Sequence, residues 1–259
     1  LIQGMGGLMS ITGNADGDPG AGPQRAGVAV SDLTSGMYAT IAILAALHHR
    51  TQTGDGQYID MALLDTQVGW LANQAMNYLI GGKVPRRTGA QHPNLVPYQP
   101  FPTADGFVII AVGNDGQFQR LCAAAGCPEL AQDPRFRTNP DRIVNRKPLV
   151  DALEKITPAR SSAEWMQLLN DANVPCGPIN TIAEVFDDPQ VRHRRMQIEL
   201  DHALGVKVPG VASPMRFSGT PVEYCKAPPL LGEDTQHVLR EMLGKGDDEI
   251  TLLREKGVI

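Results

Sequence analysis

The sequence has few of the patterns that mark the commonest metal and nucleotide sites. Its 259 residues include four cysteines, none with the CxxC spacing typical of a metal site. No Walker loop, GxSxG, HExxH or GxGxxG pattern occurs. We therefore expect no metal, and free thiols of the kind found in a reducing compartment.

Basic stripes and long apolar runs are also missing. The net charge is −5 and no cluster of cations interleaved with aromatics occurs, so we expect no nucleic-acid partner. No purely apolar stretch reaches the ~18 residues needed to cross a bilayer, so we expect no membrane partner. With 42% hydrophobic and 20% charged residues, the composition favours a globular fold of one large or two small domains.

The first 80 residues alternate between strand-like and helix-like patterns. An apolar run at 27–30 precedes a helical pattern over 34–50, which ends at a glycine-rich turn. A second apolar run at 58–64 precedes helical spacing over 65–80. This strand–helix–strand–helix order predicts an α/β fold with buried parallel strands.

A proline-rich stretch at 83–102 predicts a connector into a second module. A strand is expected over 107–112, followed by a helix that begins near Gln117. Two capping boxes, Ser161 with Glu164 and Thr181 with Glu184, predict helix starts. The remaining expected elements are helices at 140–155, 162–171, 182–187, 232–242 and 247–255, and a hairpin formed by 196–200 and 206–208.

Asp32 stands where the run at 27–30 meets the first long helix, and two interpretations of it remain open. In the first interpretation, Asp32 only caps the N-terminus of the helix, because caps of this type are common. Alternatively, it lies at the end of a buried strand, where the helix N-terminus favours an ionised carboxylate. Such a carboxylate can attack an acyl carbon and form an anhydride.

A second candidate is the loop between the strand at 107–112 and the helix after it. The loop reads Gly113-Asn114-Asp115-Gly116-Gln117, and its glycines let the backbone approach a ligand while free N–H groups hold an oxyanion. An ordinary strand-to-helix turn is the other interpretation. His92, which lies in the connector shortly before Tyr98, is the histidine that we expect to line a site.

Several segments in order resemble the class III CoA-transferases, a family that also contains the α-methylacyl-CoA racemases. They are GLMSITG at 7–13, GVAVSDL at 27–33, TGDGQ at 53–57 and APPLLG at 227–232. The segments NYLIG at 77–81, VPYQ at 96–99 and VPCGPIN at 174–180 resemble the branch that exchanges CoA between succinyl-CoA and glutarate.

The resemblance implies that Asp32 is the nucleophile, with CoA as a substrate and no tightly bound cofactor. It implies acyl-CoA and small carboxylic acids as ligands, and places the 113–117 loop where the family has a glycine-rich loop. Here Asn114 and Asp115 separate the two glycines, and an acidic Asp115 would weaken the binding of an anionic substrate unless it points away. A racemase-type isomerase and a non-catalytic chain that binds CoA esters are the alternatives.

The implied fold is α/β: the C-terminal part of a large Rossmann-like domain, incomplete here, plus a smaller α+β domain. Residues 1–82 belong to the large domain, 83–102 form the connector, 103–190 form the small domain and 191–259 return to the large domain. The resemblance also implies an interlocked homodimer. We expect a cytoplasmic protein, or a mitochondrial one if the source is a eukaryote. Because family members are longer and begin with a Rossmann-like segment, we expect this chain to be a fragment of a longer protein or one piece of a split enzyme.

Overall fold

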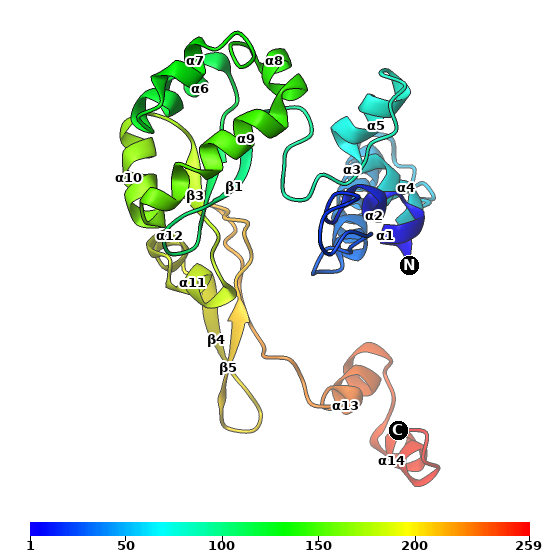
Figure 1. Ribbon diagram of the computed structural model, residues 1–259. Coiled ribbons are helices and arrows are strands. Elements are labelled where there is room, and N and C mark those ends of the chain that lie inside the picture. The colour runs from blue at the N-terminus through cyan, green and yellow to red at the C-terminus, as the bar shows by residue number, and fades with distance from the viewer. The chain divides into compact units, whose positions relative to one another are not determined.

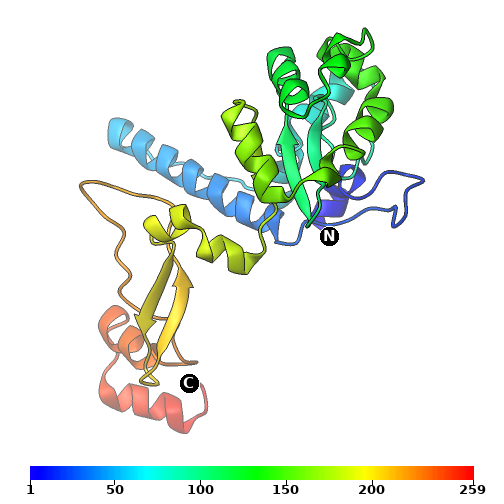
Figure 2. The same cartoon turned by 60° about the vertical axis from the view of Figure 1, so that its left-hand side comes forward.

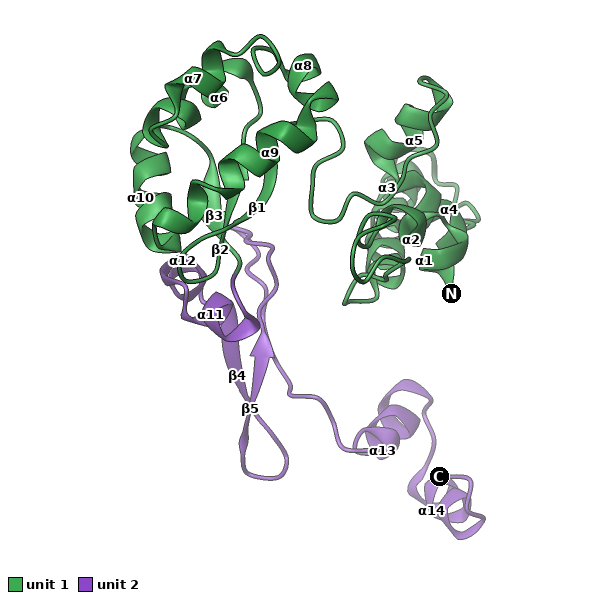
Figure 3. Cartoon of the chain, in the orientation of Figure 1, with its two compact units in different colours: residues 1–179 green, residues 180–259 purple.

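The computed structural model describes residues 1–259, which form two compact units, Leu1–Ile179 and Asn180–Ile259 (Figure 3). The chain mixes helices with two small antiparallel sheets. The finer division into a large domain, a connector and a small domain stays a prediction.

Helices and loops make up the first 82 residues of the chain (Figure 1). The helices are α1 (Ile2–Met5), α2 (Leu8–Ile11), α3 (Val30–Thr53), α4 (Leu63–Gly69) and α5 (Ala72–Leu79). The helix expected over 34–50 is confirmed as α3, whose uninterrupted course is seen in Figure 2. It ends at Gly54, whose φ of 85° is the left-handed conformation that glycine adopts without strain.

The two strands predicted in this part are wrong, and so is the parallel sheet they would form. Residues 27–28 form a bend, Val30 already belongs to α3, and 58–62 form no strand. Val28 and Tyr58 are 59% and 91% exposed. A strand is stable only when a neighbour takes its backbone hydrogen bonds, and no such neighbour lies beside either run. The helix expected over 65–80 is divided into α4 and α5.

The rest of the first unit is built on a three-stranded antiparallel sheet. Its strands are β1 (Tyr98–Pro102), β2 (Phe107–Ala111) and β3 (Cys176–Pro178), in that order across the sheet. Tyr98 pairs with Ala111, and Ile110 pairs with Cys176. The helices are α6 (Asp115–Ala124), α7 (Pro128–Gln132), α8 (Asn139–Val144), α9 (Arg146–Glu154) and α10 (Ser162–Asp171), with a 3₁₀ turn at Thr157–Ala159.

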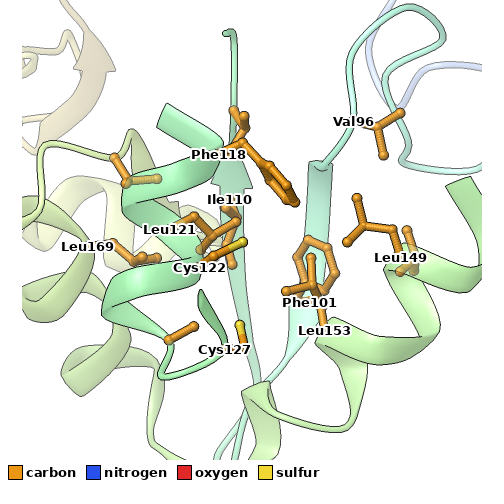
Figure 4. Close-up of a cluster of buried hydrophobic side chains, with 14 of the residues drawn as sticks. Val96, Phe101, Ile110, Phe118, Leu121, Cys122, Cys127, Leu149, Leu153 and Leu169 are labelled. Carbon is orange, nitrogen blue, oxygen red and sulfur yellow. The ribbon is translucent and has the colours of Figure 1, made fainter. Parts of the chain in front are cut away.

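The main hydrophobic core lies between this sheet and its helices (Figure 4). Phe101 and Ile110 come from the strands, Leu121 from α6, Leu149 from α9 and Leu169 from α10, and each is at most 1% exposed. Their burial is the main source of stability for this part of the chain. The core therefore fixes the start of α6, where the 113–117 loop lies.

The second unit holds the predicted hairpin, confirmed as β4 (Gln197–Asp201) paired with β5 (Lys207–Val211). Its helices are α11 (Ile182–Asp187), α12 (Pro189–His193), α13 (Thr235–His237) and α14 (Asp247–Glu255), with a π-helical turn at Val238–Met242. Both expected capping boxes are present, at the starts of α10 and α11.

Helix α3 also corrects the expectation about membrane-spanning length. Its 24 residues contain an 18-residue stretch that is long and apolar enough, by length and composition, to cross a bilayer. Core helices of soluble proteins and signal sequences satisfy the same criterion. Only 17% of its most apolar stretch is buried.

Candidate functional site

Asp32 lies in the first turn of α3, as the third residue of the helix. The residue at the N-cap position is Ala29, so the interpretation of Asp32 as the N-cap is wrong in this structure, and so is its position after a buried strand. The carboxylate is exposed and makes no side-chain hydrogen bond or ion pair. The unpaired N–H groups of a first helical turn favour a negative charge there.

The residues beside Asp32 are held in place by buried contacts. Ser31 Oγ donates a hydrogen bond of 2.7 Å to Gln67 Oε1 of α4, and both side chains are buried. Thr34 Oγ1 donates back to the carbonyl of Val30 within the same turn. Gly6, at the end of α1, lies so close that a Cβ there would be 2.3 Å from Gln67 Cγ. The first turn of α3 is thus fixed on one side, while Asp32 stays open to solvent on the other.

The 113–117 loop is the junction between β2 and α6, and it is closed by reciprocal hydrogen bonds. The N–H of Gln117 donates to Asn114 Oδ1 at 2.9 Å, and the N–H of Gly113 donates to Gln117 Oε1 at 2.6 Å. These two N–H groups are therefore already satisfied and do not belong to the free donors that the loop was expected to offer. The N–H groups of Asp115 and Gly116, in the first turn of α6, have no partner in the chain.

Asp115 points toward a buried cation rather than into open space. Its Oδ1 accepts a hydrogen bond of 2.8 Å from Arg142 Nη2, and the Arg142 side chain is 1% exposed. Arg142 also donates to the carbonyls of Val96 (2.6 Å) and Phe136 (3.0 Å), and its guanidinium lies 4.5 Å from the ring centroid of Phe118. The charge of Asp115 is thus compensated, so it weakens the binding of an anionic substrate less than an unpaired acid would.

Sequence reasoning missed Arg142. The only signal near it is a third capping box, formed by Thr138 and Asp141 at the start of α8. A capping box predicts a helix start, but it does not predict that an arginine one residue later is buried.

His92 is packed against Tyr98, with ring centroids 5.1 Å apart and ring planes 20° from parallel. Its Nδ1 accepts a hydrogen bond of 3.1 Å from the N–H of Asn94, so the neutral ring carries its proton on Nε2. Burial and then the nearby Arg146 guanidinium lower the pKa of His92. The imidazole is therefore neutral at neutral pH, with Nε2–H available to donate to a ligand.

The structure brings some of the predicted site residues together. His92 and the 113–117 loop are linked through the 92–98 segment, because the carbonyl of Val96 and the carboxylate of Asp115 bind the same guanidinium. No hydrogen bond or ion pair joins Asp32 to either of them. No group of three or more His, Cys, Asp or Glu side chains is placed to hold a metal ion.

Comparison with known proteins assigns the chain to a family. The family model described as CoA-transferase family III matches residues 1–235, so this chain belongs to CoA-transferase family III. It is 46% identical to a succinate–glutarate CoA-transferase of Agrobacterium fabrum, over 93% of this chain and 60% of that protein. It is 42% identical to a succinyl-CoA:glutarate CoA-transferase of Mus musculus, over 100% of this chain and 58% of that protein.

A solved structure agrees with this assignment. A CaiB/BaiF family protein from Brucella suis is 47% identical and superposes with a TM-score of 0.76, covering 93% of this chain and 61% of that one. The chain thus spans about three fifths of the length of the relatives it matches.

Proposed function

We propose that the protein of which this chain is part transfers CoA between succinyl-CoA, or another dicarboxylyl-CoA, and a free dicarboxylic acid such as glutarate. The observation that carries the proposal is the unpaired, exposed carboxylate of Asp32 in the first turn of α3, in a chain of CoA-transferase family III. The names of its relatives support the acid pair, since they are described as succinate–glutarate or succinyl-CoA:glutarate CoA-transferases. The names of these relatives give no support to the alternative racemase reaction.

In this reaction Asp32 forms covalent intermediates that divide the exchange into easier steps. Its oxygen attacks the thioester carbonyl of the donor, giving a mixed anhydride and CoA thiolate. The thiolate attacks the Asp32 carbonyl of that anhydride, which releases the donor acid and leaves an aspartyl-CoA thioester. The acceptor carboxylate attacks this thioester and expels the thiolate, and the thiolate then takes the acyl group from the new anhydride. Asp32 is regenerated.

Two further groups fit this chemistry. The free N–H groups of Asp115 and Gly116 are suited to hold the oxyanion of a tetrahedral intermediate. The Nε2–H of His92 is suited to bind a substrate carboxylate or carbonyl. CoA enters as a substrate, and the proposal includes no tightly bound cofactor. A homodimer and a cytoplasmic location, mitochondrial in a eukaryote, belong to the same proposal.

The test is to incubate the intact protein with succinyl-CoA and a panel of carboxylic acids. We expect glutaryl-CoA with glutarate, and hydroxylamine should trap a hydroxamate on Asp32. Asp32→Asn should abolish trapping and reduce exchange by at least about a thousandfold. Asp60→Asn is the matched control, because Asp60 is also exposed and lacks a hydrogen-bond partner.

Retained exchange in Asp32→Asn would contradict the covalent route. If the protein moved an α-proton in a 2-methylacyl-CoA with no acceptor acid present, the racemase alternative would replace the proposal. If no CoA ester bound in calorimetry, the chain would instead be non-catalytic.

A further inference from the structure

An open hollow of about 870 Å³ lies in the first unit. Its walls come from α5, from the segment that follows α5, and from α8 and α9. Neither Asp32, His92 nor any residue of 113–117 lines it. Two residues that do line it, Asn94 and Arg146, contact His92.

All of the charged side chains that line this hollow are positive. Lys83, Arg86 and Arg146 line it, and no aspartate or glutamate does. None of the three makes an ion pair, whereas the neighbouring Arg87 pairs with Asp16. Three cations without a counter-charge repel one another, and this repulsion falls when an anion binds between them.

Among these three cations, Arg146 gives the strongest indication that an anion binds in the hollow. Its Nη2 donates to the carbonyls of His92 (2.9 Å) and Pro93 (3.1 Å), while its Nη1 is buried with no hydrogen-bond partner. Burial lowers the pKa of Arg146, and no carboxylate opposes that effect. A half-buried guanidinium with an unused donor is stabilised by an oxygen anion, which supplies both charge and an acceptor.

The rest of the lining suits a ligand that also has a neutral part. The side-chain amides of Asn77 and Asn94 hold each other by hydrogen bonds of 3.3 and 3.2 Å, so both face the hollow in fixed positions. Met76, Ile80 and Ile143 add apolar surface.

We propose that this hollow is a second ligand site, which binds a carboxylate or phosphate group through Arg146 together with Lys83 and Arg86. The charged group comes either from a free dicarboxylic acid or from a phosphate-bearing ligand. The site stands on its own lining, and it does not require the transfer reaction proposed above.

Calorimetry on the intact protein tests this site in two arms, one with glutarate and one with inorganic pyrophosphate. We expect at least one titrant to bind saturably, and the arm that does so identifies the source of the anion. Lys83→Ala with Arg86→Ala should weaken that binding by at least about tenfold. Both side chains are exposed, so this pair of changes leaves the fold intact.

The matched control is Arg137→Ala with Lys155→Ala, which removes the same charge from exposed positions outside the hollow. We expect this control to bind as the unaltered protein does. Asp32→Asn should also bind normally, whatever it does to turnover. The site proposal is overturned if neither titrant binds, if the control weakens binding equally, or if Asp32→Asn removes it.

Discussion

Asp32 and Asp115 occupy similar positions, each in the first turn of a helix that follows an apolar segment. Their surroundings make them chemically different. Asp115 accepts a hydrogen bond from a buried arginine, which holds its charge in place and lowers its reactivity as a nucleophile. Asp32 has no such partner. A carboxylate that must attack an acyl carbon needs this freedom, so the contrast supports Asp32 as the nucleophile of the proposed reaction.

Arg142→Leu should destabilise the first unit strongly. The substitution leaves the carbonyls of Val96 and Phe136 without their donor, and it removes the partner of Asp115. We expect the free energy of unfolding to fall by about 3 kcal/mol, measured by urea denaturation. Asp115→Asn should lower it by no more than about 1 kcal/mol, because Asp115 is half exposed. Equal losses in the two variants would contradict the role given to Arg142.

His92 should make stability depend on pH on the acid side of neutrality. Its folded-state pKa is lowered from the ordinary value of 6.5, first by burial and then by Arg146. As the pH falls through 6.5, the unfolded chain takes up the proton before the folded chain does, so the folded state loses stability. Thermal unfolding between pH 5 and pH 7.5 should show this loss, and the loss should shrink in His92→Gln. In the control His237→Gln, which alters an exposed histidine, the pH dependence should be retained.

At the scale of elements, local signals predicted the hairpin and the helices α3, α10, α11 and α14. The helices expected over 65–80, 140–155 and 232–242 are each divided into two shorter elements. The capping boxes placed the starts of α10 and α11, and the alternating residues placed β4 and β5. Local sequence could not predict β1, because the prolines at 97, 100 and 102 made the segment resemble a connector. The strands expected at 27–30 and 58–64 failed for the opposite reason. Their sequences favour strands, but pairing depends on residues far away in the chain.

Ser161→Ala tests the most regular of these local signals. The side chain of Ser161 accepts from the N–H of Glu164, and Glu164 Oε2 accepts from the N–H of Ser161 at 2.8 Å. Because α10 contributes Trp165 and Leu169 to the core, losing this cap should lower the free energy of unfolding of the first unit by about 1 kcal/mol. Urea denaturation measures the change. Ser161→Asn should recover most of the stability, and no recovery would show that capping is not the cause.

At the scale of the molecule, the buried apolar residues are concentrated in the first unit. The second unit contributes only Ala212, Ala227 and Ile250. We therefore expect backbone amides of β1, β2 and α6 to exchange with deuterium more slowly than those of α14, as measured by mass spectrometry. Protection in α14 equal to that in β2 would contradict this expectation.

Part of the candidate site could be predicted from the sequence, and the rest depends on how the whole molecule folds. The 113–117 loop follows from a local strand-to-helix pattern, and family resemblance singles out Asp32. Local sequence does not predict that Asp115 pairs with Arg142. Nor does it predict that Met37, Ile41 and Leu44 of α3 are exposed. Both features depend on tertiary contacts between distant parts of the chain, which local patterns do not encode.

Gly6 takes no part in the chemistry, but its lack of a side chain restricts which substitutions the protein tolerates at this position. Any larger residue there must displace Gln67, and Gln67 in turn holds the hydroxyl of Ser31, one residue before the proposed nucleophile. A substitution of Gly6, which directly follows α1, can therefore inactivate the protein although Asp32 itself is unchanged.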